Sequence, residues 1–142
     1  MILANYKIAV SVETSSGTYS VLNGIDNVTE SVGRIVNTYH FLEDGGMARS
    51  HATGAAPSFT FTGRRICGDT AQDFIFAKKY AFGGDADVSL KIVVTTSEGL
   101  TPSTQTITAD ATIADVQEFS GSTTDDSAIS ITFNINGTPT VA

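Results

Sequence analysis

Apolar residues recur at every second position over much of this chain of 142 residues. The clearest runs lie at 6–12, 59–61, 88–94 and 129–135, where apolar side chains share one parity and polar side chains share the other. A period of two is typical of β-strands that bury one face in a core and expose the other. The sequence therefore predicts a mainly β fold.

Two further segments predict strands of a different kind. The segment 32–43 has apolar residues on both parities, which favours a strand that is covered on both sides. In the segment 104–118 a row of Thr and Asp residues alternates with Ile and Ala, and the parity then changes. We expect a β-bulge or bend near Ala114 and Asp115, because one extra residue shifts the alternation.

One helix is predicted at 70–80. Asp69 is a suitable N-cap, Gln72 follows three residues later as in a capping box, and a Gly-Gly pair at 83–84 is expected to end the helix. Apolar side chains, including Phe74 and Phe76, surround most of this helix, whereas a surface helix normally carries one apolar stripe. We infer that it packs partly on its own sheet and partly on another subunit. The alternative is complete burial within its own domain.

The longest expected loop is 43–57, which is rich in Gly and Ala. Structureless loops of this length are uncommon and usually serve a function. The sequence shows no repeat and no linker, so we expect one domain over residues 1–142.

The charge pattern favours self-association over nucleic-acid binding. The net charge is −7 with only eight Lys and Arg residues, and affinity for nucleic acids comes mainly from such cations. Charged residues make up 16% of the chain, against about 25% in typical soluble domains. Much of the surface must consist of uncharged Thr, Ser, Gly and Asn, as in surfaces that pack against copies of themselves.

No set of residues predicts catalysis, a metal site or a cofactor site. Cys67, with His40 on a strand and His51 in a loop, has no spacing that would bring a base to the thiol, and we expect it to be a buried structural thiol. Asp69 and Asp73 fit helix capping better than acid–base chemistry. The acidic pairs at 85–87 and 125–126 lack the spacing of a calcium loop. We therefore expect a protein that is not an enzyme and has no cofactor.

The first residues lack a basic segment followed by an apolar run, so we expect no signal peptide. No apolar stretch is long enough to predict a membrane anchor.

The middle of the chain resembles the tail tube proteins of bacteriophages. The likeness rests on the strand, Gly-Asp turn and helix start at 58–75, on Phe41–Gly46 before it, and on the closing strand at 129–137, and it covers about residues 30 to 137. It implies two packed antiparallel sheets, as a β-sandwich or rolled barrel, with one short flanking helix near 70–80. It also implies hexameric rings that stack into a hollow tube, the conduit for DNA ejection in a phage tail.

The resemblance implies a distribution of surfaces. The inner sheet would comprise 32–43, 57–66, 104–118 and 126–135, and the 43–57 loop would reach the neighbouring ring. The residues expected to face the lumen are Asp110, Ser130, Thr132 and Asn134. The residues expected between rings are Glu43, Asp44, Met47 and Arg49. The residues expected between subunits are Arg64, Arg65, Phe74 and Phe76, although the two arginines equally fit a solvated strand end.

The expected partners are further copies of the chain, a tape-measure protein and tail-end proteins, with DNA passing through without specific binding. Such a protein would be made in the bacterial cytoplasm and reside in the virion. Two alternatives remain open at this level. One is a monomeric β-sandwich that binds a ligand such as a carbohydrate, which the absence of Trp disfavours. The other is a pilin or adhesin subunit, which would need a signal peptide.

Overall fold

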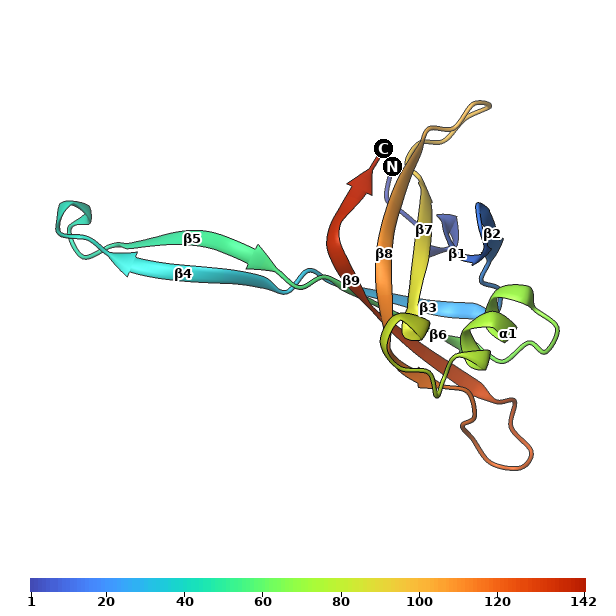
Figure 1. Ribbon diagram of the computed structural model, residues 1–142. Coiled ribbons are helices and arrows are strands. Elements are labelled where there is room, and N and C mark those ends of the chain that lie inside the picture. Colours follow the sequence, from blue (N-terminus) through green and yellow to red (C-terminus); the bar gives the residue numbers. More distant parts are fainter.

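The computed structural model covers residues 1–142 and shows a mainly β chain with one α-helix. Seven strands form one antiparallel sheet in the order β2-β1-β7-β8-β9-β6-β3. These are β1 (Ile8–Ser15), β2 (Thr18–Val21), β3 (Ile25–Ser31), β6 (Ser58–Arg64), β7 (Asp87–Thr95), β8 (Thr104–Gln117) and β9 (Ala128–Val141). Strands β4 (Arg34–His40) and β5 (Ala48–Ala55) pair with each other and project from the body as an arm (Figure 1).

The seven-stranded sheet curls so that its apolar face encloses the core. Val12 of β1, Phe61 of β6 and Phe133 of β9 belong to one cluster of 16 buried residues, although β1 lies four places from β6 in the sheet order. The rings of Phe61 and Phe133 pack edge to face, with centroids 5.9 Å apart. The predicted β-rich, antiparallel fold with one flanking helix is confirmed. The two packed layers are the two limbs of one continuous sheet.

The bulge expected in the segment 104–118 is confirmed. The pairing of β8 with β9 shifts register between Ile113 and Asp115. Before the shift Ala111 points into the core and is fully buried, and after it Val116 packs against the same core. The extra residue thus keeps apolar side chains inward on both sides of the bend.

Helix α1 (Thr70–Ala77) packs against β1 and β2. Asp69 is its N-cap, as predicted, because a side-chain oxygen of Asp69 accepts a hydrogen bond from the Gln72 N–H at 3.2 Å. The helix ends at Ala77, three residues earlier than expected, and Tyr80 is exposed beyond it. The Gly-Gly pair therefore does not end the helix; it opens a short 3₁₀ segment, η3 (Gly83–Ala86). The chain contains no helix with the length and hydropathy needed to span a bilayer.

Gln72 joins α1 to two distant parts of the chain. Its side chain is fully buried. Its amide nitrogen donates to the carbonyl of Asn23 at 2.6 Å and to that of Arg64 at 3.0 Å, and its amide oxygen accepts from the Ile66 N–H at 2.8 Å. The Gln72 side chain therefore makes these three hydrogen bonds in place of the capping-box contact predicted for it. The amide satisfies backbone groups where the β2–β3 turn and the end of β6 meet the helix.

Replacing Gln72 with Leu should lower the free energy of unfolding by on the order of 3 kcal/mol. The substitution keeps the volume but leaves buried backbone donors and acceptors unpaired, each at a cost of about 1–3 kcal/mol. Urea unfolding followed by circular dichroism measures this loss. Gln117→Leu at an exposed position of β8 is the control and should have little effect. Equal stability of the Gln72 variant and the parent would contradict the role given to this amide.

The prediction of a long loop at 43–57 is wrong. Residues Ala48–Ala55 form β5, which pairs with β4 from Arg34–Ala55 to His40–Ala48. Only the connection between these strands, with the 3₁₀ turn η2 (Leu42–Asp44), is irregular. The Gly- and Ala-rich composition has low intrinsic β-propensity, but backbone pairing with β4 supplies the structure. The prediction that 32–43 is covered on both sides is also wrong within the subunit, because every residue of β4 is exposed.

Two single-residue expectations need correction. Cys67 is exposed, in the turn between β6 and α1, and is not a buried thiol. Tyr6 shares the parity of the core residues of β1 but lies in the 3₁₀ turn η1 (Asn5–Lys7) and is 85% exposed. For Tyr6, the chain leaves the strand geometry on which the parity argument depends.

Candidate assembly surfaces

The convex face of the curled sheet is mostly polar, apart from residues such as Ala9 of β1 and Val93 of β7. The registers place Thr60 of β6 between Thr29 of β3 and Thr132 of β9, and the hydroxyls of Thr60 and Thr132 lie 3.2 Å apart. Directly opposite residues of antiparallel strands share a face. By the same rule Asp115 of β8 lies opposite Thr132. Further along the same face, Asp110 of β8 lies between Asn136 of β9 and Ser89 of β7, and the Ser89 hydroxyl donates to the Asp110 carboxylate at 3.1 Å.

This polar face has two halves of different charge. Strands β3, β6 and β9 present only hydroxyl and amide side chains over nine positions. These are Asn27, Thr29, Ser31, Ser58, Thr60, Thr62, Ser130, Thr132 and Asn134. Apart from Arg64 at the end of β6, which shares the parity of Thr62, strands β1, β7 and β8 carry the charges of the face, which are mostly acidic. These are Glu13, Asp87, Lys91, Asp110 and Asp115.

The four residues predicted to face the lumen lie on this one polar face. Ser130, Thr132 and Asn134 follow one another along β9 in the uncharged half, and Asp110 lies in the charged half. Of the four segments expected to form the inner sheet, β6, β8 and β9 are contiguous. The fourth, 32–43, is not beside them, because β4 lies in the arm. The edge strand next to β6 is β3, which sequence reasoning missed because only Val28 packs against the core in its middle.

The arm continues the β3–β6 strand pair beyond the body. β4 follows β3 after two residues, β5 precedes β6 by two residues, and the Ala56 N–H binds the carbonyls of Val32 and Gly33 at the junction. Near its far end the arm carries two stacked aromatic rings, those of Tyr39 and Phe41, with centroids 5.7 Å apart. Both long edges of the arm are unpaired, which is rare in an isolated soluble protein because open edges invite further strand pairing.

The residues predicted to contact a neighbouring ring lie together at the end of the arm. We define the tip as residues 41–49. Asp44 and Arg49 form an ion pair of 2.7 Å, and the Arg49 guanidinium lies 5.8 Å from the Phe41 ring centre. Met47 is 73% exposed and Leu42 is fully exposed. The geometry makes the tip a small ordered surface with exposed apolar side chains, and its contact with another ring stays a prediction.

Arg65 ties α1 to the β8–β9 connection within the subunit. Its guanidinium donates to Asp73 at 2.8 Å and to Glu118 at 3.1 Å, and it lies 4.8 Å from the ring centre of Phe76. Lys79 donates to the other oxygen of Glu118 at 2.8 Å. These contacts use most of the Arg65 donors within the subunit, and the role expected for Arg65 between subunits stays a prediction.

Phe76 is also an internal residue. It is 5% exposed in the single subunit and belongs to the core, which favours the burial alternative at this position, and its role between subunits stays a prediction. Phe74 is half-buried, and Arg64 is exposed with a single hydrogen bond of 3.3 Å to the carbonyl of Asp126. Phe74 and Arg64 stay candidates for contacts between copies.

Stability should depend on Glu118 above pH 4. The hydrogen bond from Lys79, followed by that from Arg65, lowers the pKa of Glu118 below its ordinary value. A carboxyl group with a lowered folded-state pKa stabilises the protein above its unfolded pKa of about 4.3, and the stabilisation is lost as the pH falls through the folded value. Glu118→Gln should lower the unfolding free energy by about 1 kcal/mol at pH 7.

The check is urea unfolding of parent and variant from pH 7 down to pH 3. The difference between them should shrink below about pH 4.3, where the unfolded carboxyl is protonated. Glu98→Gln is the control, because Glu98 pairs with Lys7 at 3.2 Å with 69% of its side chain exposed. A difference that stays constant over the whole range would contradict the assignment.

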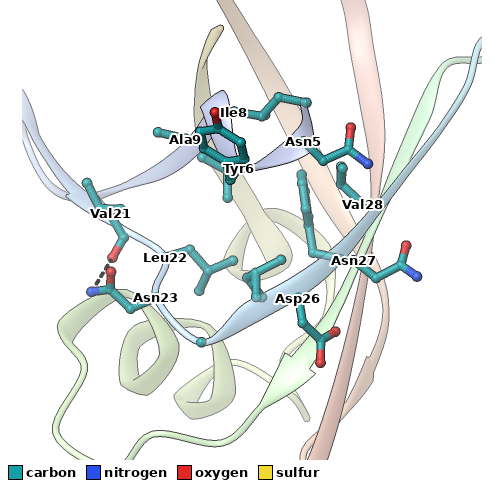
Figure 2. Close-up of a pocket in the computed structure, with 14 residues that line it drawn as sticks. Asn5, Tyr6, Ile8, Ala9, Val21, Leu22, Asn23, Asp26, Asn27 and Val28 are labelled. Atoms are coloured by element: carbon teal, nitrogen blue, oxygen red, sulfur yellow. Dashed lines mark hydrogen bonds between the residues drawn. The ribbon is translucent and has the colours of Figure 1, made fainter. Parts of the chain in front are cut away.

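A pocket of about 500 Å³ lies where the two ends of the curled sheet approach each other. We call it the seam pocket. One wall comes from the start of the chain, with Tyr6, Ile8 and Ala9, and the other comes from β3, with Asp26, Asn27 and Val28 (Figure 2). Core side chains such as Phe61 also line it, and nine of its 14 lining residues are hydrophobic. The seam pocket thus lies beside the core between strands that do not pair, although its core lining residues Val10, Leu22 and Phe61 are themselves buried.

The structure does not bring together the residues considered for catalysis. His40 and His51 lie on the arm, whereas Cys67 lies on the body beside α1 (Figure 1). Asp69 and Asp73 are used in the cap and in the ion pair with Arg65. The surfaces with the most distinct geometry are the polar face, the arm and the seam pocket.

Known structures share this fold at low sequence identity. A chain from the virion of a native gene transfer agent particle superposes with a TM-score of 0.73 at 11% identity, and the match covers 99% of both chains. A chain from the tail of an empty particle of this kind, a structure with C6 symmetry, gives 0.73 at 15% identity with the same coverage. The SPP1 tail tube gives 0.73 at 13% identity, over 99% of this chain and 78% of that one.

Sequence comparison adds no relative to these. No sequence profile of a known family matches the chain, and no curated protein matches it in sequence. A further structural match is a chain of the sheath–tube complex of an extracellular contractile injection system, with a TM-score of 0.67 at 14% identity over 99% of this chain. Since these matches extend over the whole chain, including the curled sheet and its flanking helix, the protein has the tail tube fold.

Proposed function

We propose that this chain is a structural subunit that assembles into hexameric rings, which stack into a hollow tail tube. The single observation that carries the proposal is the whole-chain likeness to the SPP1 tail tube and to a tail with C6 symmetry. The chain's own surfaces support it. The arm has open edges and exposed apolar side chains that an isolated subunit leaves uncovered.

The uncharged half of the polar face, together with the adjacent strand β8, would line the lumen. Strands β8, β9, β6 and β3 are contiguous and would give four strands per subunit. Twenty-four strands spaced about 4.8 Å apart and tilted by about 40° make a barrel of roughly 48 Å diameter between backbones. That leaves room for a DNA duplex after side chains are placed. A wall of hydroxyl and amide groups with a few carboxylates offers phosphates no row of cations to bind.

The protein would therefore act as a conduit in a virion tail and not as a catalyst. Tube-end proteins and a tape-measure protein are its expected partners, with DNA passing through without specific binding. The arm, through Glu43, Asp44, Met47 and Arg49, would bridge to a neighbouring ring. Since structural matches include both phage and contractile injection tubes, the proposal extends to either kind of particle.

Negative-stain electron microscopy of the purified protein tests the proposal. The expected result is rings or tubes whose end views show six-fold symmetry. Sedimentation measures the size of the assemblies over a range of concentrations. A homogeneous monomer that persists at the highest soluble concentration would overturn the proposal and favour the ligand-binding sandwich.

A further inference from the structure

Two asparagines of the chain are followed directly by glycine, in the pairs Asn23–Gly24 and Asn136–Gly137. Asparagine is one of the chemically labile residues of proteins, because its side-chain amide can be lost by reaction with the backbone nitrogen of the next residue. Glycine permits this reaction best, since it has no side chain and its backbone rotates most freely. The other asparagines precede Tyr, Val, Thr or Ile. Only the two Asn-Gly pairs are therefore candidates, and the structure places them differently.

The first pair is fixed by hydrogen bonds and by close packing. Asn23 Nδ2 donates to the Asp69 carboxylate at 2.7 Å, and the Asn23 carbonyl accepts from Gln72 Nε2 at 2.6 Å. The Gly24 carbonyl accepts from the Arg64 N–H at 2.8 Å, and a Cβ on Gly24 would lie 2.7–2.9 Å from three other atoms. Attack on the side-chain amide requires the peptide unit between Asn23 and Gly24 to rotate. This rotation would break these hydrogen bonds.

The second pair lies where β9 bulges away from its neighbours. Asn136 pairs with Asp110 of β8, but the register then shifts, and residues 137–139 have no partner in that strand. The other neighbour, β6, pairs with β9 only as far as Asn134. Asn136 and Gly137 are both exposed, and a Cβ on Gly137 would meet no atom within 4 Å. The peptide unit between them therefore has a freedom that the other Asn-Gly pair lacks.

We propose that Asn136 is a site of spontaneous deamidation and that Asn23 is protected from the same reaction. The Gly137 backbone nitrogen loses its proton to hydroxide and attacks Cγ of Asn136. The new N–Cγ bond forms, the Cγ–Nδ2 bond breaks, and the leaving nitrogen takes a proton from water and departs as ammonia. Water then opens the cyclic imide at either carbonyl, which gives aspartate or isoaspartate at this position. The inference does not depend on assembly, so its failure leaves the proposed function standing.

The new carboxylate enters an acidic part of the polar face. Asn136 lines a hollow of about 610 Å³ with Glu13, Asp87 and Asp110, and no Lys or Arg lines it. Asn136 Nδ2 donates to the Thr112 hydroxyl at 2.8 Å, and this hydroxyl donates to the Asp87 carboxylate at 2.7 Å. A carboxylate in place of the amide has no hydrogen to donate, and the single hydroxyl hydrogen of Thr112 cannot serve two carboxylates. Deamidation therefore replaces a hydrogen bond with repulsion between like charges.

Peptide mass spectrometry of aged protein tests the site. Purified folded protein is incubated at mildly alkaline pH and digested, and the peptides are fragmented so that Asn134 and Asn136 are distinguished. Conversion at Asn136 should run about tenfold faster than at Asn23, because Asn23 must first give up about two hydrogen bonds. The rate at Asn136 should rise in proportion to the hydroxide concentration.

The matched control is the same chain unfolded in guanidinium chloride, where both Asn-Gly pairs are free and should convert at similar rates. Equal rates at Asn23 and Asn136 in the folded protein would overturn the protection assigned to Asn23. An Asn136 that stays intact in the folded protein while it reacts in the unfolded chain would overturn the site itself.

The variant Asn136→Asp carries the aspartate product and tests its effect on the fold. At pH 7 it should lower the urea midpoint of unfolding more than Asn27→Asp, which makes the same charge change on the uncharged half of the polar face. Repulsion from Glu13, Asp87 and Asp110 raises the folded-state pKa of the new carboxyl, so its destabilising effect is present above the unfolded pKa of about 3.9 and is lost below it. The difference between the two variants should therefore shrink as the pH falls. Equal midpoints at pH 7 would overturn the predicted repulsion.

Discussion

Replacing residues 34–55 with a short Asn-Gly turn should yield a folded subunit that forms no tubes. Gly33 and Ala56 are already joined by a backbone hydrogen bond of 3.1 Å, so a two-residue hairpin turn can close the β3–β6 pair at this point. The arm contributes no residue to the core cluster. Its removal therefore takes away the proposed contact with a neighbouring copy without opening the interior.

Thermal unfolding measures whether the armless subunit is folded, and electron microscopy measures whether it forms tubes. The melting temperature should stay within a few degrees of the parent value, since a loss of about 1 kcal/mol shifts it by only about 2–8 °C in domains of this size range. Assembly should fall below detection. Thr38→Ser is the control, because it keeps the arm and the hydroxyl that lies 3.4 Å from Ser50. Normal tubes from the armless variant would show that the arm is dispensable for assembly.

Gly63→Ala should destabilise the subunit by about 3 kcal/mol or more, the upper range for overpacking a closed site. Gly63 lies opposite the register shift between β3 and β6. A Cβ at this position would lie 2.8 Å from the Cα of Ile25 and closer still to the carbonyl oxygen of Gly24. Both contacts are with backbone, so no side-chain rotation relieves them. The β2–β3 turn would have to separate from β6.

The matched control for this substitution is Gly84→Ala. No atom lies within 4 Å of the place that a methyl group would take on Gly84, and its φ is not positive, so the added group meets open space there. Chemical unfolding of both variants gives the comparison. Equal stability of the Gly63 and Gly84 variants would contradict this prediction, because it would mean that the β2–β3 turn can move away from β6 at little cost in free energy. The Arg64 N–H bond to the Gly24 carbonyl, at 2.8 Å, is the principal one at risk.

Strands that bury one face could be predicted from the sequence because burial imposes the alternation. Phe59 and Phe61 in β6, and Ile129 to Ile135 in β9, are examples. The same reasoning explains the failure at β5. Neither face of the arm is buried within the subunit, so Ala48–Ala55 carries no alternation to detect. The apolar residues of β4 on both parities indicated a covered strand, and under the proposed assembly the cover comes from other copies.

The polar face could be predicted in part. Ser130, Thr132 and Asn134 alternate with buried residues, so their common face follows from the strand period. The role of Gln72 could not be predicted, because its partner Asn23 lies 49 residues away and nothing local marks the contact. The burial of Phe76 within the subunit could not be predicted for a similar reason. An apolar helix surface looks the same in sequence whether the curled sheet or another copy covers it.

The exposed position of Cys67 has a practical consequence. It is the chain's single thiol, and it lies in the turn before α1, away from the arm and outside the seam pocket. A maleimide dye should therefore attach at one known place on each subunit. Counting photobleaching steps in isolated rings would then report stoichiometry directly, with six steps expected for the proposed ring, and tube length would be proportional to total fluorescence.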